Sequence, residues 1–228
     1  MDERSVGVAP RSKPDDPRAK RRAARIAGNR ADILDAAERT FAERGLTEGS
    51  LRDIAKHAGF STAAIYNYFD NKQQLLAQTL ARRGAELLAV IEGAAADGAT
   101  AMDKLHHIVD ATTDFFGTYP HFRRMLRHAG EADAIIASVL TQYGGDGADL
   151  FSPTLELMTS IVQDGQRRGE VRPGNPSALI HLYMTLVYEH VFLAAANPDR
   201  SLTRDEFHDL VDGALRSPTS PTRKRPRR

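Results

Sequence analysis

The run SLRDIAKHAGFSTAAIYNYF, residues 50–69, is the most informative part of this sequence. Ser50 and Asp53 have the Ser-x-x-Asp spacing of a capping box, which marks the start of a helix. Gly59 supplies the left-handed backbone with which a helix ends, and Ser61 is placed to cap the next helix. Two short helices joined by a glycine turn are the geometry that seats the second helix in the major groove of DNA. The run therefore predicts a helix-turn-helix.

Helical periodicity continues on both sides of this run. A helix is expected to begin near Lys20–Arg30 and to be established by Ala31. Apolar residues from Ile33 to Phe41 recur at steps of three and four until Gly45, and Asn71 is placed to cap a longer helix that reaches Ile91. Residues 93–101 are predicted to be a loop or break. The pattern predicts further helices at about 62–68, 102–117, 120–129, 131–142, 152–168, 176–196 and 203–215.

No β-type alternation exceeds four residues, so the fold is predicted to be all-α. We expect an N-terminal three-helix helix-turn-helix domain followed by a larger C-terminal helical domain. The expected boundaries are a flexible basic arm over 1–29, the helix-turn-helix domain over 30–80, the C-terminal helical domain over 81–215 and a basic disordered tail over 216–228.

Charge is distributed unevenly along the chain. The formal net charge of the 228 residues is +1, yet residues 1–30 hold nine Lys/Arg against four acids, and residues 216–228 hold six Lys/Arg and no acid. The remainder is acidic, with 16 bases against 26 acids. Basic ends on an acidic body predict that the ends meet a polyanion, and the alternative is that they are solvated tails.

Several function classes are disfavoured by composition. The chain has no cysteine, which excludes disulfides and thiolate metal sites. Its most apolar stretch, Met184 to Ala196, is interrupted by Glu189 and His190 and is shorter than the roughly 20 residues that span a bilayer. The first residues lack the apolar centre of a secretory signal. We therefore expect a cytoplasmic protein without membrane contact.

The run from Leu51 to Lys72 closely resembles the DNA-binding domain of the tetracycline-repressor (TetR/AcrR) family. The matching elements are Ile-Ala-x-x-Ala-Gly from Ile54, the serine after it, Tyr-x-x-Phe from Tyr66 and a lysine three residues beyond that Phe. The helix that begins at Ile33 matches too, and beyond about residue 80 the resemblance is architectural. It implies a DNA-binding transcriptional regulator: a repressor that a small molecule releases from a palindromic operator.

The resemblance also assigns roles to individual residues. Thr62 and Ala63 lie where base edges are met, whereas Tyr66 and Lys72 match phosphate contacts, which fix register rather than read sequence. Tyr66 and Tyr68 have the alternative of packing inside the small domain. Because Ala63 offers only a methyl group, Arg52 and the arm are expected to carry more of the readout. The candidate DNA-binding residues are Ser50, Arg52, Ser61, Thr62, Ala63, Tyr66, Asn67, Tyr68 and Lys72, with Lys20, Arg21, Arg22 and Arg25 of the arm.

Residues 81–215 carry 19 acids against 11 bases and are not expected to meet DNA. The resemblance implies that this part is the regulatory domain, a helical ligand-binding and dimerisation domain. Its last two long helices would pair with those of a second copy, the alternative being burial inside a monomer. The predicted homodimer interface comprises Leu155, Ile161, Val162, Leu179, Leu186, Val187, His190 and Val191. The candidate lining of a site for a small apolar or aromatic ligand, which plain core packing would also explain, comprises Phe115, Phe116, Tyr119, Phe122, Met125, Met158 and Tyr183.

Two rival interpretations remain open. Eight histidines raise the possibility of an enzyme or a metal site, with His106 and Asp110 as the best-spaced pair. No nucleophile motif, phosphate loop or metal-ligand spacing accompanies them, so we expect no catalytic residue, no metal and no cofactor. The other interpretation is a DNA-binding regulator that needs no ligand and is controlled by a protein partner.

Overall fold

The computed structural model describes residues 17–130, 152–197, 199 and 201–218, so the predicted helix at 131–142 and the ends of the chain lie outside the described residues. The described part is built of α-helices, as predicted, and its only extended pairing is a single bridge between Val171 and Arg216. No helix in that part is long and apolar enough to cross a membrane. The helices are α1 (Pro17–Arg44), α2 (Leu51–Ala58), α3 (Thr62–Ile65), α4 (Lys72–Ala96), α5 (Ala101–Thr118), α6 (Pro120–Gly130), α8 (Ser152–Arg167), α9 (Pro176–Ala196) and α10 (Arg204–Leu215).

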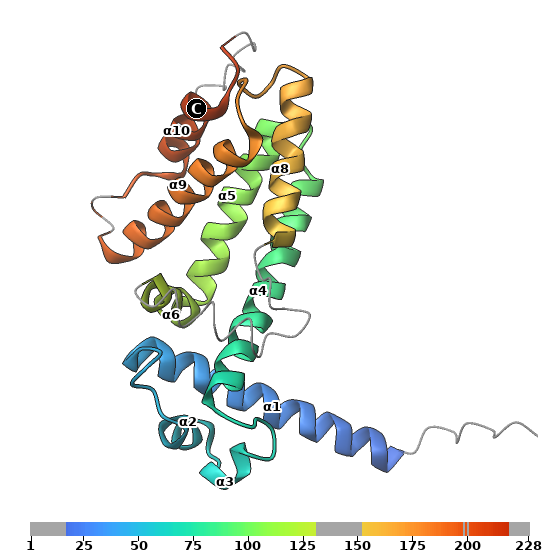
Figure 1. The fold of residues 1–228 in the computed structure, drawn as a ribbon, viewed down its shortest axis with the longest axis vertical. Coiled ribbons are helices and arrows are strands. Elements are labelled where there is room, and N and C mark those ends of the chain that lie inside the picture. The colour runs from blue at the N-terminus through green and yellow to red at the C-terminus, as the bar shows by residue number, and fades with distance from the viewer. Residues whose placement is uncertain (1–16, 131–151, 198, 200, 219–228) are drawn as a thin grey trace, which may run out of the picture.

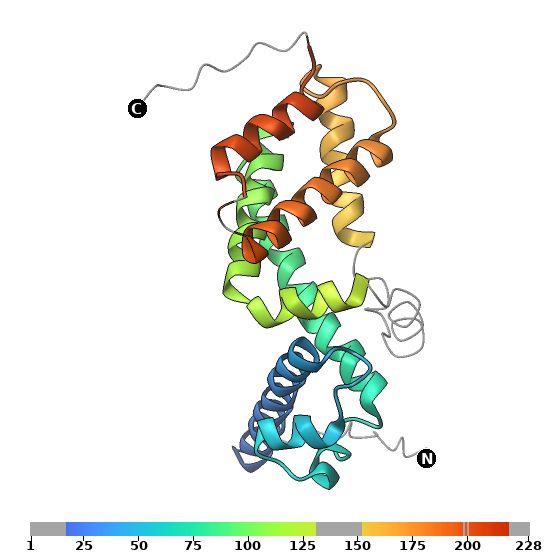
Figure 2. The same ribbon diagram turned by 90° about the vertical axis from the view of Figure 1, so that its left-hand side faces the viewer.

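The helices form a small head and a larger body that share α4. The head holds α1, α2, α3 and the first turns of α4, whereas the rest of α4 forms the body with α5, α6, α8, α9 and α10 (Figure 1 and Figure 2). Within the body α4 packs against α5 and α8. Leu75, Leu76 and Leu80 of α4 are buried near its start, and Ile91 and Ala95 are buried near its end. At 25 residues α4 is about 37 Å long. It therefore connects the DNA-binding head mechanically to the far side of the body.

The first helix begins at Pro17, shortly before the start expected near Lys20–Arg30. Residues 17–29, which the expected boundaries place in the flexible arm, therefore form the first turns of α1, and their side chains are almost all exposed. Pro17 does not prevent this, because the first helical position needs no backbone N–H donor. The alanines, arginines and lysines that follow it are strong helix formers. The basic extension is a helical rod that leaves the head (Figure 1).

Two other boundaries differ from those predicted. The helix expected over 62–68 ends at Ile65, and Tyr66 to Tyr68 form a turn whose amides bond to Ala64 and Ile65. The break expected at 93–101 is confined to residues 97–100, because the alanine-rich end of α4 keeps its helical hydrogen bonds through Ala96 despite Gly93. Because α4 continues to Ala96, it forms part of the body over a greater length than predicted.

A buried ion-pair network joins the head to the body. Glu38 of α1, whose side chain is only 6% exposed, accepts from Arg83 Nε at 2.7 Å, and Glu86 accepts from the same guanidinium at 2.6 Å. The guanidinium also lies 3.9 Å from the ring centroid of Tyr119, at the α5–α6 corner. Burial alone would lower the pKa of Arg83, but the bonds to Glu86 and Glu38 outweigh it and raise that pKa. Arg83 therefore holds three elements together at the junction.

The histidines of the body have a structural use. His106 pairs with Asp212 of α10, with Nε2 and Oδ1 3.0 Å apart, and Asp110 pairs with His208 at 2.9 Å. The two imidazoles stack with centroids 4.3 Å apart. Asp110 thus partners His208 instead of completing a site with His106, and no group of three or more His, Cys, Asp or Glu in the described residues could hold a metal. These pairs fasten α10 to α5.

Candidate functional site

The start of α2 is fixed by Ser50. Its hydroxyl accepts from the Asp53 amide at 3.2 Å and donates to Asp53 Oδ2 at 2.5 Å. The bond from Ser50 lowers the pKa of Asp53, and the charge of Arg44, 3.4 Å away, lowers it further. The predicted cap is confirmed. The Ser50 hydroxyl is thus engaged within the head.

The turn and α3 present a small exposed surface. Gly59 has the predicted left-handed conformation, with φ 72°, and Ser61 accepts from the Ala64 amide at 3.1 Å to begin α3. Ile65 is fully buried and packs α3 against the core of the head. The opposite side carries the exposed Ala63, Tyr66 and Asn67, while Thr62 is half-buried and Arg52 of α2 is exposed. Figure 1 shows α3 at the end of the head farthest from the body.

The two tyrosines of this segment differ in their surroundings. Tyr66 is 55% exposed, so its ring does not serve the core of the head. Tyr68 is half-buried, its hydroxyl accepts from Asn29 Nδ2 at 2.8 Å, and its carbonyl accepts from Arg30. The structure thus supports the packing alternative for Tyr68, which ties the turn to α1. Tyr66 is exposed and stays a predicted phosphate contact.

Lys72 lies at the N-terminus of α4. Asn71 caps this helix by accepting from the Gln74 amide at 2.8 Å, as predicted. The Lys72 amino group donates to the Thr47 carbonyl at 2.6 Å and so fastens the loop before α2. Burial lowers the pKa of Lys72, and nearby Glu48 partly opposes the shift. A cation beside a helix N-terminus is a favourable setting for a phosphate.

Replacing Lys72 with Ala is expected to weaken binding to every DNA sequence alike and to flatten the salt dependence of log K by about one unit. The reason is that a phosphate contact releases one counterion and reads no base. Fluorescence anisotropy over a salt series measures both effects, and thermal unfolding checks that losing the Thr47 bond leaves the head folded. Arg124→Ala on α6 is the matched control. Unchanged affinity in folded Lys72→Ala would remove Lys72 from the site.

The helical extension carries the other cations. Lys20, Arg21, Arg22 and Arg25 are all exposed on the first turns of α1, and Arg21 Nε donates to the Pro17 carbonyl at 3.2 Å. At about 100° per residue, three of them share one face with Arg18. Arg18 was missed by sequence reasoning because a flexible arm has no faces. The arginine stripe consists of Arg18, Arg21, Arg22 and Arg25.

These elements define a DNA-binding protein of the helix-turn-helix class. Residues 33–79 match the family described as "Bacterial regulatory proteins, tetR family". The repressor KstR2 of Rhodococcus jostii is 42% identical over 53 residues, which are 23% of this chain and only 26% of that protein. The repressor BepR of Brucella suis is 26% identical over 163 residues, 67% of this chain and 73% of that protein.

A solved structure extends the likeness to the whole fold. FadR from Bacillus subtilis, in complex with stearoyl-CoA, superposes with a TM-score of 0.60 at 19% identity, covering 81% of this chain and 94% of that chain. The match to the TetR family covers the head, and the chain as a whole shares the fold of this solved regulator.

The outward face of α9 differs from the stripe predicted for the dimer. Ile161, Val162, Val187 and Val191 are buried within the protomer, and the His190 ring stacks on Phe207, with centroids 4.1 Å apart. All five residues were predicted to face a partner. The side chains of the isoleucine and the three valines are instead buried in the core of the protomer.

The apolar surface that remains on α8 and α9 combines the predicted Leu155, Leu179 and Leu186 with two further leucines. Leu182 is 60% exposed, Leu155 and Leu193 are exposed, and Leu179 and Leu186 are half-buried. The four α9 leucines recur at steps of three, four and seven, so they lie on one side of the helix. Sequence reasoning missed Leu182 and Leu193 because α9 is apolar almost all round. We call Leu179, Leu182, Leu186 and Leu193 the α9 leucine face.

The predicted ligand residues form a packed aromatic cluster. Phe115, Phe116 and Phe122 are buried with ring centroids 5.6 to 6.3 Å apart, and Tyr119 joins Phe115 at 4.8 Å. Met125 and Met158 are also buried. Tyr183 is fully buried and donates to the Leu105 carbonyl at 2.7 Å, and its burial raises the pKa of the hydroxyl. The structure thus places these residues in the core of the body.

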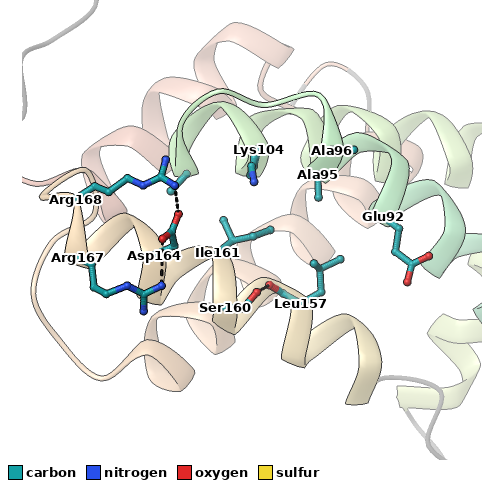
Figure 3. Close-up of a pocket in the computed structure, with 11 residues that line it drawn as sticks. Glu92, Ala95, Ala96, Lys104, Leu157, Ser160, Ile161, Asp164, Arg167 and Arg168 are labelled. Atoms are coloured by element: carbon teal, nitrogen blue, oxygen red, sulfur yellow. Dashed lines mark hydrogen bonds and ion pairs between the residues drawn. The ribbon is translucent and has the colours of Figure 1, made fainter.

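A separate cleft opens elsewhere, between α4, α5 and α8 (Figure 3). Its volume is about 460 Å³, within the range of small-molecule sites. None of the seven predicted ligand residues lines it. Sequence reasoning had no signal for it, because the wall from α8 is remote in sequence from the walls formed by α4 and α5.

Proposed function

We propose that this regulator represses transcription as a homodimer on a palindromic operator in the cytoplasm, and that a small molecule bound by the body releases it. The observation that carries the proposal is the exposed α3 surface, where Tyr66 stands in solvent while Ile65 anchors the helix. A short helix of this kind reads too few bases alone. Two copies related by two-fold symmetry would read two half-sites about a helical turn or more apart.

The α9 leucine face supports the dimer. A leucine that is 60% exposed beside two half-buried leucines gains free energy when a second copy covers it. The two-fold symmetry of such a contact makes the same surface serve both copies. It would also fix the separation of the two heads, because each head is joined to its body through α4.

The regulatory part rests on α4 as well. This helix joins the head at Leu75–Leu80 and the cleft at Ala95–Ala96, so a molecule that moves its far end would tilt the head. The FadR neighbour binds stearoyl-CoA, which shows that a protein of this fold takes up a small molecule. No observation favours the alternative of a ligand-independent regulator with a protein partner, or an enzyme.

A reporter assay tests repression directly. The promoter region that the purified protein binds best is fused to a reporter in cells with and without the regulator gene. We expect expression to rise when the gene is deleted and to fall again when the wild-type gene, but not its Tyr66→Ala variant, is restored. Lower expression after deletion would instead make the protein an activator, against this proposal.

The arginine stripe supplies a further expectation. Removing residues 1–28 should weaken operator binding by roughly tenfold or more at low salt and by less at high salt, because the lost term is electrostatic. The melting temperature should barely change, since the removed side chains of α1 are exposed. A full-length variant with the stripe changed to Gln keeps the helix and tests charge alone. If both variants bound as wild type at every salt concentration, the extension would not contribute to DNA binding.

A further inference from the structure

The cleft in the body has one polar side and one apolar side. It lies between the end of α4, the start of α5 and the C-terminal part of α8. Figure 3 shows Lys104 directed into the hollow from α5, opposite Leu157 and Ile161 of α8. The lining residues are Glu92, Ala95, Ala96, Ala101, Lys104, Leu157, Ser160, Ile161, Asp164, Arg167 and Arg168.

The charges in the cleft leave one cation available. Asp164 accepts from Arg167 at 3.1 Å and from Arg168 at 2.7 Å, so its carboxylate is already neutralised. The Glu92 carboxylate points away from the hollow (Figure 3). Within the described parts of the chain, Lys104 makes no ion pair. A carboxylate entering the cleft would therefore find a cation that no protein acid competes for.

Lys104 is held in place by the turn that precedes α5. A side chain at Gly98 would lie 2.4 Å from Lys104 Cγ and 2.6 Å from its backbone nitrogen, so the turn packs directly on the lysine stem. The α5 N-terminus is already satisfied, because Thr100 and Asp103 form a capping box and the Ala101 amide donates to Glu170 at 2.7 Å. The amino group of Lys104, rather than the helix end, is thus the open anion contact.

The other residues that line the cleft determine which kind of chain could follow the anionic group of a ligand. Ala95, Ala101 and Ile161 are buried and Leu157 is half-buried, so they offer an aliphatic surface beside the cation. Among the described residues, no aromatic side chain lines the hollow. We propose that the cleft binds an aliphatic carboxylate, with its anionic head on Lys104 and its chain along Leu157 and Ile161. A flat aromatic ligand would find no stacking partner there.

This assignment names the effector class of the regulator and rests on the function proposed above. A molecule between Lys104 and Leu157 bridges α5 to α8 and touches the last turns of α4 at Ala95 and Ala96. A bound molecule would therefore favour one arrangement of α4 relative to α8. Because the head lies at the other end of α4, this arrangement also determines the position of the head. Occupation of the cleft therefore changes the spacing of the heads and weakens operator binding.

Calorimetric titration of the full chain with octanoate tests the site, with octanol and octylammonium as probes of the same chain length without the anion. We expect octanoate to bind and the other two to bind at least tenfold more weakly. Lys104→Gln should weaken octanoate at least tenfold, because a charge-assisted bond is lost, and Lys104→Arg should stay within a few-fold of wild type. Arg127→Gln, an exposed cation on α6, is the matched control and should bind as wild type.

Operator binding with and without octanoate completes the test. We expect octanoate to weaken the operator complex of wild type and of Arg127→Gln, but not that of Lys104→Gln. Absence of octanoate binding, or equal binding by Lys104→Gln, would overturn the site. Binding that leaves operator affinity unchanged would overturn the effector role. In each of these cases operator binding without octanoate reports separately on the DNA-binding part of the proposed function, which fails if that binding is absent.

Discussion

Leu182→Asp is expected to convert the dimer into a monomer and to remove measurable operator binding. Leu182 is 60% exposed at the centre of the α9 leucine face, so in the dimer its side chain becomes buried. A carboxylate buried there without a partner costs several kcal/mol, and symmetry places two of them at one interface. Multi-angle light scattering at micromolar concentration reports the mass, and anisotropy with labelled operator reports the binding.

The matched control is Leu210→Asp, on α10. Leu210 is 44% exposed and lies outside the α9 leucine face, so this variant should remain a dimer with wild-type affinity. Leu186→Asp, one turn along α9 from Leu182, should behave like Leu182→Asp. A wild-type monomer in light scattering, or a Leu182→Asp dimer as stable as wild type, would show that α9 is not the interface.

Glu38→Gln is expected to lower the free energy of unfolding by about 3 kcal/mol, because it removes the buried partner of a buried cation. The Glu38 side chain is 6% exposed, and that of Arg83 is 12% exposed. Glu86 remains bonded to Arg83, which keeps the loss near the lower end of the range for such pairs. Urea unfolding at one fixed protein concentration measures the change, since dimer stability depends on concentration.

Asp35→Asn separates burial from charge in this network. Asp35 pairs with Arg82 at 2.7 Å, yet its side chain is 60% exposed, so its loss should cost less than about 1 kcal/mol. Equal effects of the two substitutions would mean that the junction is an ordinary surface network. A large effect confined to Glu38 would show that the head is fastened to the body through Arg83.

The head could be predicted from sequence because its signals are local. Ser50, Gly59 and Asn71 act on backbone groups within a few residues of themselves, so spacing alone revealed the start of α2, its end and the start of α4. The same locality explains the error at residues 17–29. Three prolines and many charges indicated disorder, but Pro17 stands at the one helical position that tolerates it, and the residues after it favour helix.

The junction and the cleft could not be predicted because their parts are remote in sequence. Glu38 and Arg83 are 45 residues apart, and Lys104 faces α8 residues more than 50 positions away. The predicted dimer face included buried residues for another reason: almost every α9 position is apolar, so periodicity could not separate the buried Val187 from the exposed Leu182. The packing of α5, α8 and α10 against α9 makes that distinction.

Sequencing the genomic fragments that the purified protein retains is the most direct test of a dimeric helix-turn-helix regulator. We expect a small set of fragments that share an inverted repeat, with half-site centres a helical turn or more apart, and loss of this set with Leu182→Asp. Retention of fragments without a shared inverted repeat, or an unchanged set with Leu182→Asp, would contradict it.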